Sequence, residues 1–202
     1  MKKLFVFAAM AAVALTSCDN NDNIELGKDD EGVAKTEAVV LNELDGEEKF
    51  IELYNNTDAA VNLEGYSLVK YDAAKDGGKS TTWTGVAAIS IPAKGYVVLE
   101  SSDLSDPAEK GDENYEYESE NHVFKGGLSA KKNIKIELVK PDGTVADTFI
   151  RGEEGSLGWN ESEIGKDPDK NSYSRCPDGV GEWAYAASTK GAANGAKVKD
   201  IQ

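Results

Sequence analysis

The chain has 202 residues, of which 37 are Asp or Glu and 22 are Lys or Arg, so its formal net charge is −15 at pH 7. This excess of acid argues against a nucleic-acid partner, because binding to phosphates depends on Lys and Arg. It argues equally against electrostatic adhesion to anionic lipid. A chain of this length suits one main domain, which buries about 70% of the surface that its unfolded form exposes.

The first 17 residues have the three parts of a secretory signal peptide. Two lysines precede an apolar run over residues 4–15, and two small residues follow it. The run is too short to cross a bilayer core of roughly 30 Å, which takes about 20 apolar residues. We therefore predict that residues 1–17 are a leader that is removed from the mature protein.

The leader ends directly before Cys18. Residues 15–18 read Leu-Thr-Ser-Cys, which resembles the bacterial lipobox. The resemblance implies cleavage before Cys18, a diacylglycerol on its thiol and a fatty acyl chain such as palmitate on its new amine. Several acyl chains, at roughly 0.8 kcal/mol per buried CH₂, would hold an outer membrane lipoprotein firmly. The alternative is an ordinary signal peptide in which Cys18 stands at this place by chance.

Residues 18–35 are predicted to be a flexible acidic tether. Residues 19–35 contain six acids and two lysines and show no apolar periodicity, so they cannot bury enough apolar surface to offset the entropy of ordering. As a coil the segment spans roughly 20–25 Å. Acids directly after the cysteine resemble the signal that sends lipoproteins to the cell surface in some Gram-negative lineages. The alternative is a plain spacer.

From Thr36 onward the sequence consists of short β-type runs separated by turn residues. In residues 133–139, Ile134, Ile136 and Leu138 alternate with polar side chains, which is the period of a half-buried strand. Turn signals recur every 8–12 residues, as in a sandwich or barrel. The core is therefore predicted to be all-β, with strands within residues 38–44, 49–54, 66–71, 86–91, 96–101, 133–139 and 144–150.

Two long segments, residues 101–121 and 151–171, interrupt this rhythm. Loops longer than about 12–15 residues are usually functional or disordered. The first is acidic, but its acids lack the register and the glycine turn of a calcium loop. Residues 167–178 imitate such a loop only in part, since Ser172 stands where glycine is required. We predict no metal and no cofactor, while weak calcium binding stays open.

Motifs at both ends of the β region resemble the lamin tail domain in its bacterial form. The opening motif is Leu41-Asn42-Glu43, followed by Phe-Ile-Glu-Leu-Tyr-Asn at residues 50–55. Further matching positions are Val61, Leu63, Gly65, Tyr66, Ser174, Arg175, Pro177, Asp178, Gly179, Trp183 and Asn194. The resemblance covers residues 36–195 and leaves residues 196–202 as a C-terminal tail. It implies an immunoglobulin-like β-sandwich used for interaction.

Departures from the family pattern are few. Lys190 stands where the family usually has a Thr-Pro-Gly turn, which we expect to loosen that turn and leave the fold unchanged.

Two acids on neighbouring predicted strands are the main candidates for chemistry. Glu52 shares a strand face with Phe50 and Tyr54, and Glu43 lies on the strand beside it. Paired carboxylates can bind a cation or transfer protons. More often such acids accept hydrogen bonds from backbone amides or from an arginine, and Arg175 is the candidate donor here. All three interpretations remain open at the level of sequence, with the structural one favoured.

No sequence motif indicates catalysis. The only histidine is His122, and no nucleophile elbow, zinc-protease motif or phosphate-binding loop is present. We therefore predict a non-enzymatic, lipid-anchored interaction module that binds a protein partner. The alternative is a carbohydrate-binding module, in which exposed Trp83, Trp159 and Trp183 would stack on sugar rings of a surface glycan.

Overall fold

The computed structural model describes residues 36–72, 78–105, 119–130, 132–152, 167 and 169–200. They fall within one compact unit, Thr36–Gln202. The predicted leader, the tether and the proposed lipidation site at Cys18 lie outside the described residues, as does Trp159. Within the described part of the chain, no helix has the length and apolar character needed to span a membrane.

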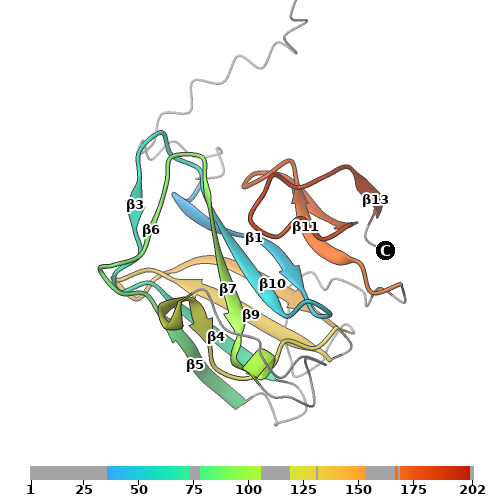
Figure 1. Cartoon of the computed structure of the whole chain (residues 1–202), viewed down its shortest axis with the longest axis horizontal. Coiled ribbons are helices and arrows are strands. Elements are labelled where there is room, and N and C mark those ends of the chain that lie inside the picture. The colour runs from blue at the N-terminus through green and yellow to red at the C-terminus, as the bar shows by residue number, and fades with distance from the viewer. Residues whose placement is uncertain are drawn as a thin grey trace, which may run out of the picture. The chain divides into compact units, whose positions relative to one another are not determined.

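The larger sheet has seven strands (Figure 1). Its neighbours are antiparallel except for the last pair, which is parallel. In spatial order the strands are β13 (Lys197–Asp200), β12 (Glu182–Ala186), β11 (Ser172–Cys176), β1 (Val39–Asp45), β2 (Phe50–Asn55), β7 (Tyr96–Ser101) and β8 (Val123–Phe124). Strand β13 lies within the segment that the sequence predicted to be a C-terminal tail.

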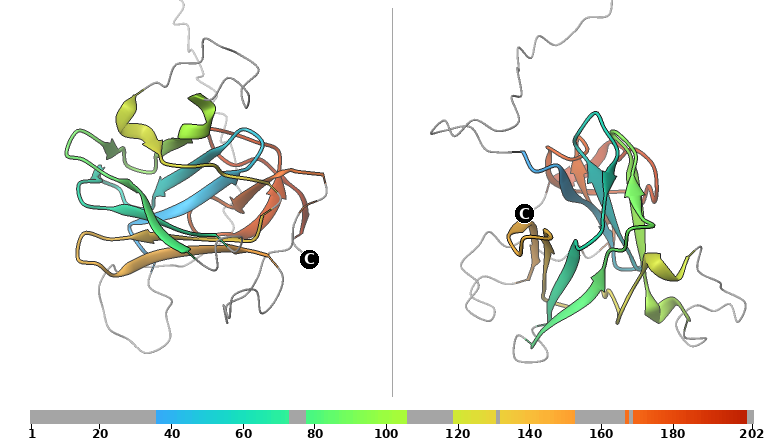
Figure 2. Two further views of the ribbon diagram at one scale, coloured as in Figure 1. Left: turned by 90° about the horizontal axis from the view of Figure 1, so that it is seen from below. Right: turned by 90° about the vertical axis from the view of Figure 1, so that its left-hand side faces the viewer.

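The second sheet has four antiparallel strands, and Figure 2 shows it as a separate layer beside the first. In spatial order they are β10 (Val145–Arg151), β9 (Ile134–Val139), β4 (Ser67–Asp72) and β5 (Gly78–Thr84). A short ribbon pairs β3 (Val61–Asn62) with β6 (Ser90–Ile91). Single 3₁₀ turns, η2 (Ser102–Ser105) and η3 (Glu120–His122), complete the described elements. The predicted all-β sandwich is confirmed.

The core lies between the two sheets. In β9, Ile134, Ile136 and Leu138 are buried while the residues between them are half-buried, as their period of two predicted. Leu53 of β2 joins the same cluster. Phe50 is also fully buried, but it points to the opposite face of β2 and lies outside that cluster, because successive side chains of a strand point to opposite faces.

Strand β5 was not predicted from the sequence, which suggested a turn over residues 72–80. The strand reads Gly-Lys-Ser-Thr-Thr-Trp-Thr, and its first four residues are exposed. It lies at the edge of the four-stranded sheet. Edge strands are often polar, so the apolar alternation that reveals a central strand is missing here.

Candidate functional site

The paired acids lie side by side in the larger sheet. Glu43 of β1 and Glu52 of β2 are cross-strand partners, and both are fully buried. They lie on the face of the sheet that points away from the core, beneath the closing loop, by which we mean residues 187–195. Thr189 of this loop donates to Glu43 through its amide (3.2 Å) and its hydroxyl (2.8 Å).

Glu52 is held in the same way. The Asn42 side-chain amide donates to it at 2.9 Å, and the backbone amide of Gly191 in the closing loop donates at 2.7 Å. The structural interpretation, in which these acids accept hydrogen bonds from amides, is therefore confirmed. Their hydrogen bonds fasten the closing loop to the sheet.

Arg175 is not their partner, and this prediction was wrong. The Arg175 guanidinium lies 2.9 and 3.0 Å from the two carboxylate oxygens of Asp147 in β10, and its Nε donates to the Leu41 carbonyl. Ser174, not Arg175, is the cross-strand partner of Glu43. Adjacent residues of a strand point to opposite faces, so Arg175 points toward the second sheet.

Burial governs the acidity of the pair. It raises the pKa of Glu52 to about 7, against the hydrogen bonds from Asn42 and Gly191, and the nearby charge of Glu43 raises it further. Burial likewise raises the pKa of Glu43. Both carboxyl groups are covered by the protein itself. Within the described ranges, no group of three or more His, Cys, Asp or Glu is arranged to hold a metal ion.

The described tryptophans do not form a flat exposed surface. Trp83 is only 4% exposed, and its Nε1 donates to the Asn121 carbonyl at 2.8 Å. Trp183 is partly buried between the Arg175 guanidinium, 4.5 Å from its ring centroid, and the ring of Phe149. Neither indole presents a face for stacking on a sugar.

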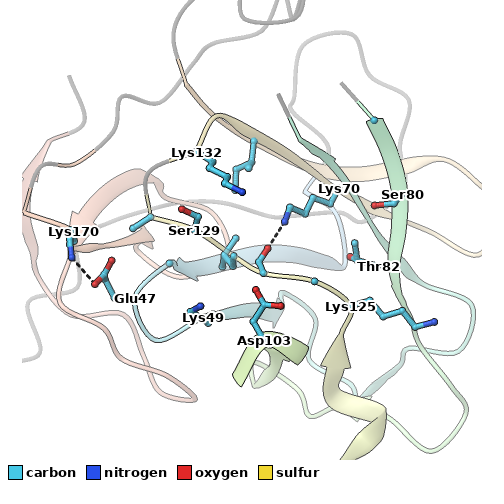
Figure 3. Close-up of a pocket in the computed structure, with 17 residues that line it drawn as sticks. Glu47, Lys49, Lys70, Ser80, Thr82, Asp103, Lys125, Ser129, Lys132 and Lys170 are labelled. Atoms are coloured by element: carbon cyan, nitrogen blue, oxygen red, sulfur yellow. Dashed lines mark hydrogen bonds and ion pairs between the residues drawn. The ribbon is translucent and has the colours of Figure 1, made fainter. Parts of the chain in front are cut away.

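A hollow of about 630 Å³ opens at one end of the sandwich, and we call it the lysine hollow. Its described lining comes from the turn between β1 and β2, the inner face of β4 and β5, η2, residues 125–130, Lys132 and Lys170 (Figure 3). None of the described residues that line it is aromatic. Its charged lining residues are Lys49, Lys70, Lys125, Lys132, Lys170, Glu47 and Asp103.

Lys70 occupies an inward-facing position. It is the cross-strand partner of Ile136, a core residue, and it lies two residues after Leu68, which is fully buried. Its Nζ donates to the Gly127 carbonyl (Figure 3). The charged side chain of Lys70 therefore borders the apolar core at this end of the sandwich.

Gly127, whose carbonyl accepts from Lys70, stands where a larger residue would not fit. A Cβ atom added to Gly127 would lie 2.0 Å from an oxygen of Asp103, so a side chain here would displace the backbone or the acid. Close approach of this kind is a common reason for glycine. The neighbouring Gly126 amide donates to the Ser102 hydroxyl of η2 at 2.9 Å, which joins this segment to η2.

Sequence reasoning missed the lysine hollow. Its five lysines are spread along the chain from position 49 to position 170, so no local spacing brings them together. The one available signal was Lys70, which interrupts the apolar alternation of β4 after Leu68. A charge at an inward-facing position of a strand is unusual.

Two packed sheets with this topology define an immunoglobulin-like β-sandwich. The chain belongs to the lamin tail domain family, whose model matches residues 33–152. The closing motif with Ser174 and Trp183 lies beyond this match, and the structure places its strand β11 beside β1 in the same sheet. A comparison with curated proteins finds no match.

Proposed function

We propose that this protein is a lipid-anchored lipoprotein of the bacterial outer membrane, exposed at the cell surface, whose β-sandwich binds a protein partner without catalysis. The observation that carries the proposal is the lysine hollow, an open and charged site on a scaffold whose buried acids are engaged in structural hydrogen bonds. Binding sites are commonly concave surfaces held by a rigid scaffold.

The anchor in this proposal is lipid on Cys18. It rests on the lipobox resemblance and on the acidic segment that follows the cysteine. The net charge of −15 opposes attachment to anionic lipid by charge, and it opposes a nucleic-acid partner.

Labelling with a clickable palmitate analogue in bacterial cells tests the anchor. We expect Cys18→Ala to abolish labelling, while the matched variant Cys176→Ala keeps it. Labelling of Cys18→Ala at the level of the unchanged protein would refute lipidation at this residue.

A photocrosslinking amino acid tests the interaction in the intact envelope. Placed at Ser80, which lines the hollow, it should form a discrete, protease-sensitive adduct. The control position is Lys79, the adjacent residue, whose side chain lies beside Tyr71 on the other face of β5. Equal crosslinking at both positions would refute a partner at the hollow.

The carbohydrate alternative predicts a different result. Strong binding of the full-length protein to neutral sugars on a glycan array would favour it over a protein partner. The burial of Trp83 and the enclosed ring of Trp183 argue against that outcome.

A further inference from the structure

The charge of the lysine hollow is opposite to the charge of the chain. The protein has a formal net charge of −15, whereas the described residues that line the hollow include five lysines and two acidic side chains. Like charges that line one concave space repel each other, and a hollow focuses their field because its walls have a low dielectric constant. The arrangement is therefore unfavourable in itself and suits a bound anion.

The lysines differ in what they already contact. Lys170 is paired with Glu47 at 2.9 Å, and Lys70 donates to the Gly127 carbonyl. Lys125 and Lys132 are exposed, and the structure records no ion pair for either of them among the described residues. These two are the positive charges most accessible to a ligand.

The size and lining of the hollow narrow the class of ligand. A space of about 630 Å³ is in the range of sites for drug-sized ligands and far exceeds one phosphate group. Among the described lining residues none is aromatic, so these residues offer no stacking surface of the kind on which sugars and nucleobases usually rest. What remains among the described lining residues is a set of separated positive charges and the exposed hydroxyl group of Ser80.

These groups match an extended peptide. Backbone amides and carbonyls of a peptide can bond to hydroxyl groups such as that of Ser80. Carboxylates spaced along the peptide can reach lysines on separate walls. Lysine acts as a point charge on a flexible stem, which suits carboxylates of variable spacing.

We propose that the lysine hollow binds an extended acidic peptide segment of a partner protein, with its carboxylates at Lys125 and Lys132 and its backbone beside the hydroxyl group of Ser80. This inference rests on the proposed function and specifies the chemistry of the partner. Ion pairs at an open site are screened by salt, so binding weakens as ionic strength rises above about 0.1 M.

Fluorescence anisotropy tests the proposal with the full-length lipidated protein in phosphatidylcholine nanodiscs. The probe is a fluorescein-labelled peptide of eight residues that alternates Glu and Gly, and the control peptide replaces each Glu with Gln. We expect the Glu peptide to bind at 20 mM NaCl, to weaken at 300 mM NaCl, and to bind far more tightly than the Gln peptide.

A pair of matched variants separates a local site from general electrostatics. Lys125→Gln with Lys132→Gln should weaken binding by about tenfold, as expected for two exposed ion pairs. Lys79→Gln with Lys94→Gln removes the same charge outside the hollow, where Lys79 lies near Tyr71 and Lys94 near Asp58, and should change binding by less than about twofold. The thermal midpoint of each variant shows that it is folded.

Any of four results would overturn the proposal. Two concern the peptides: the Glu peptide does not bind at millimolar concentration, or the Gln peptide binds as tightly as the Glu peptide. The others are that both double variants lose the same amount of affinity, or that polygalacturonate or inorganic phosphate displaces the Glu peptide preferentially. A protein adduct at Ser80 without peptide binding would support the proposed interaction module but reject an acidic peptide as its ligand. Loss of both would reject the proposed function as well.

Discussion

Charged side chains gather in two regions of the described sandwich, and the two regions differ in whether the protein itself supplies their partners. Beneath the closing loop, the carboxylates of Glu43 and Glu52 are buried and accept hydrogen bonds from the chain itself. In the lysine hollow, Lys125 and Lys132 are exposed, and the described residues supply them with no ion pair. Buried charges persist when their own protein satisfies them, so the first region holds the fold together. The second is available to another molecule.

Asn42 is central to the first region. Its side-chain amide donates to Glu52 and to Asp178, each at 2.9 Å, and its side-chain oxygen accepts from the amide of Gly179 at 2.9 Å. Asn194 of the closing loop donates through its side-chain amide to the backbone carbonyl of Asn42 and through its backbone amide to the Asp178 carboxylate. One residue of β1 thus joins the sheet to two loops.

The largest expected effect comes from breaking this network. Asn42→Ala would leave Glu52, Asp178 and the Gly179 amide short of a partner inside the protein, and such groups cost about 1–3 kcal/mol each. We expect the free energy of unfolding to fall by about 3 kcal/mol or more in denaturant titrations followed by tryptophan fluorescence.

The control for this change is Asn62→Ala. Asn62 also forms side-chain hydrogen bonds, to Ala87 and Ser90, but at an exposed position, so its removal should cost less than about 1 kcal/mol. Similar losses in the two variants would mean that the network under the closing loop contributes no more than surface hydrogen bonds do.

A smaller effect is expected from pH. The pKa of Glu52 is about 7 in the folded protein against an ordinary value of 4.5, so the folded state binds this proton more tightly than the unfolded chain. The free energy of unfolding therefore falls as pH rises through this interval, by about 2 kcal/mol between pH 5.5 and 8. The raised pKa of Glu43 acts in the same direction.

Glu52→Gln isolates this contribution. The variant has no titrating group at position 52, so its stability should depend less steeply on pH in urea titrations at pH 5.5, 7 and 8, whatever its absolute stability. A variant with the same slope as the unchanged protein would show that Glu52 ionises in the fold as easily as in the unfolded chain.

The same contrast explains what the sequence could and could not predict. The alternation around Ile136 and the motif around Asn42 are local patterns, so the strand β9 with its core residues, and the position of Glu43 beside Glu52, could be predicted from them. Arg175 was assigned the wrong partner because sequence alone does not say that Ser174 is the residue opposite Glu43. The described lining of the lysine hollow comes from six segments that are separated in the sequence, and only Lys70 interrupted a local pattern in a way that the sequence could show. Features that depend on residues near each other in the sequence can be predicted from it, whereas a site assembled from loops far apart in the chain cannot.

The smallest expected effect is the loss of the hollow's accessible charges. Lys125→Gln with Lys132→Gln should change the free energy of unfolding by less than about 0.5 kcal/mol, as is usual for exposed positions away from special features. Reduced repulsion among the lysines even favours a slight gain in stability at low salt. The measurement is a denaturant titration beside Asn42→Ala. A loss above about 1 kcal/mol would show that these lysines fasten residues 125–132 to the sandwich. The two charged regions would then share a structural role, and the contrast between them would fail.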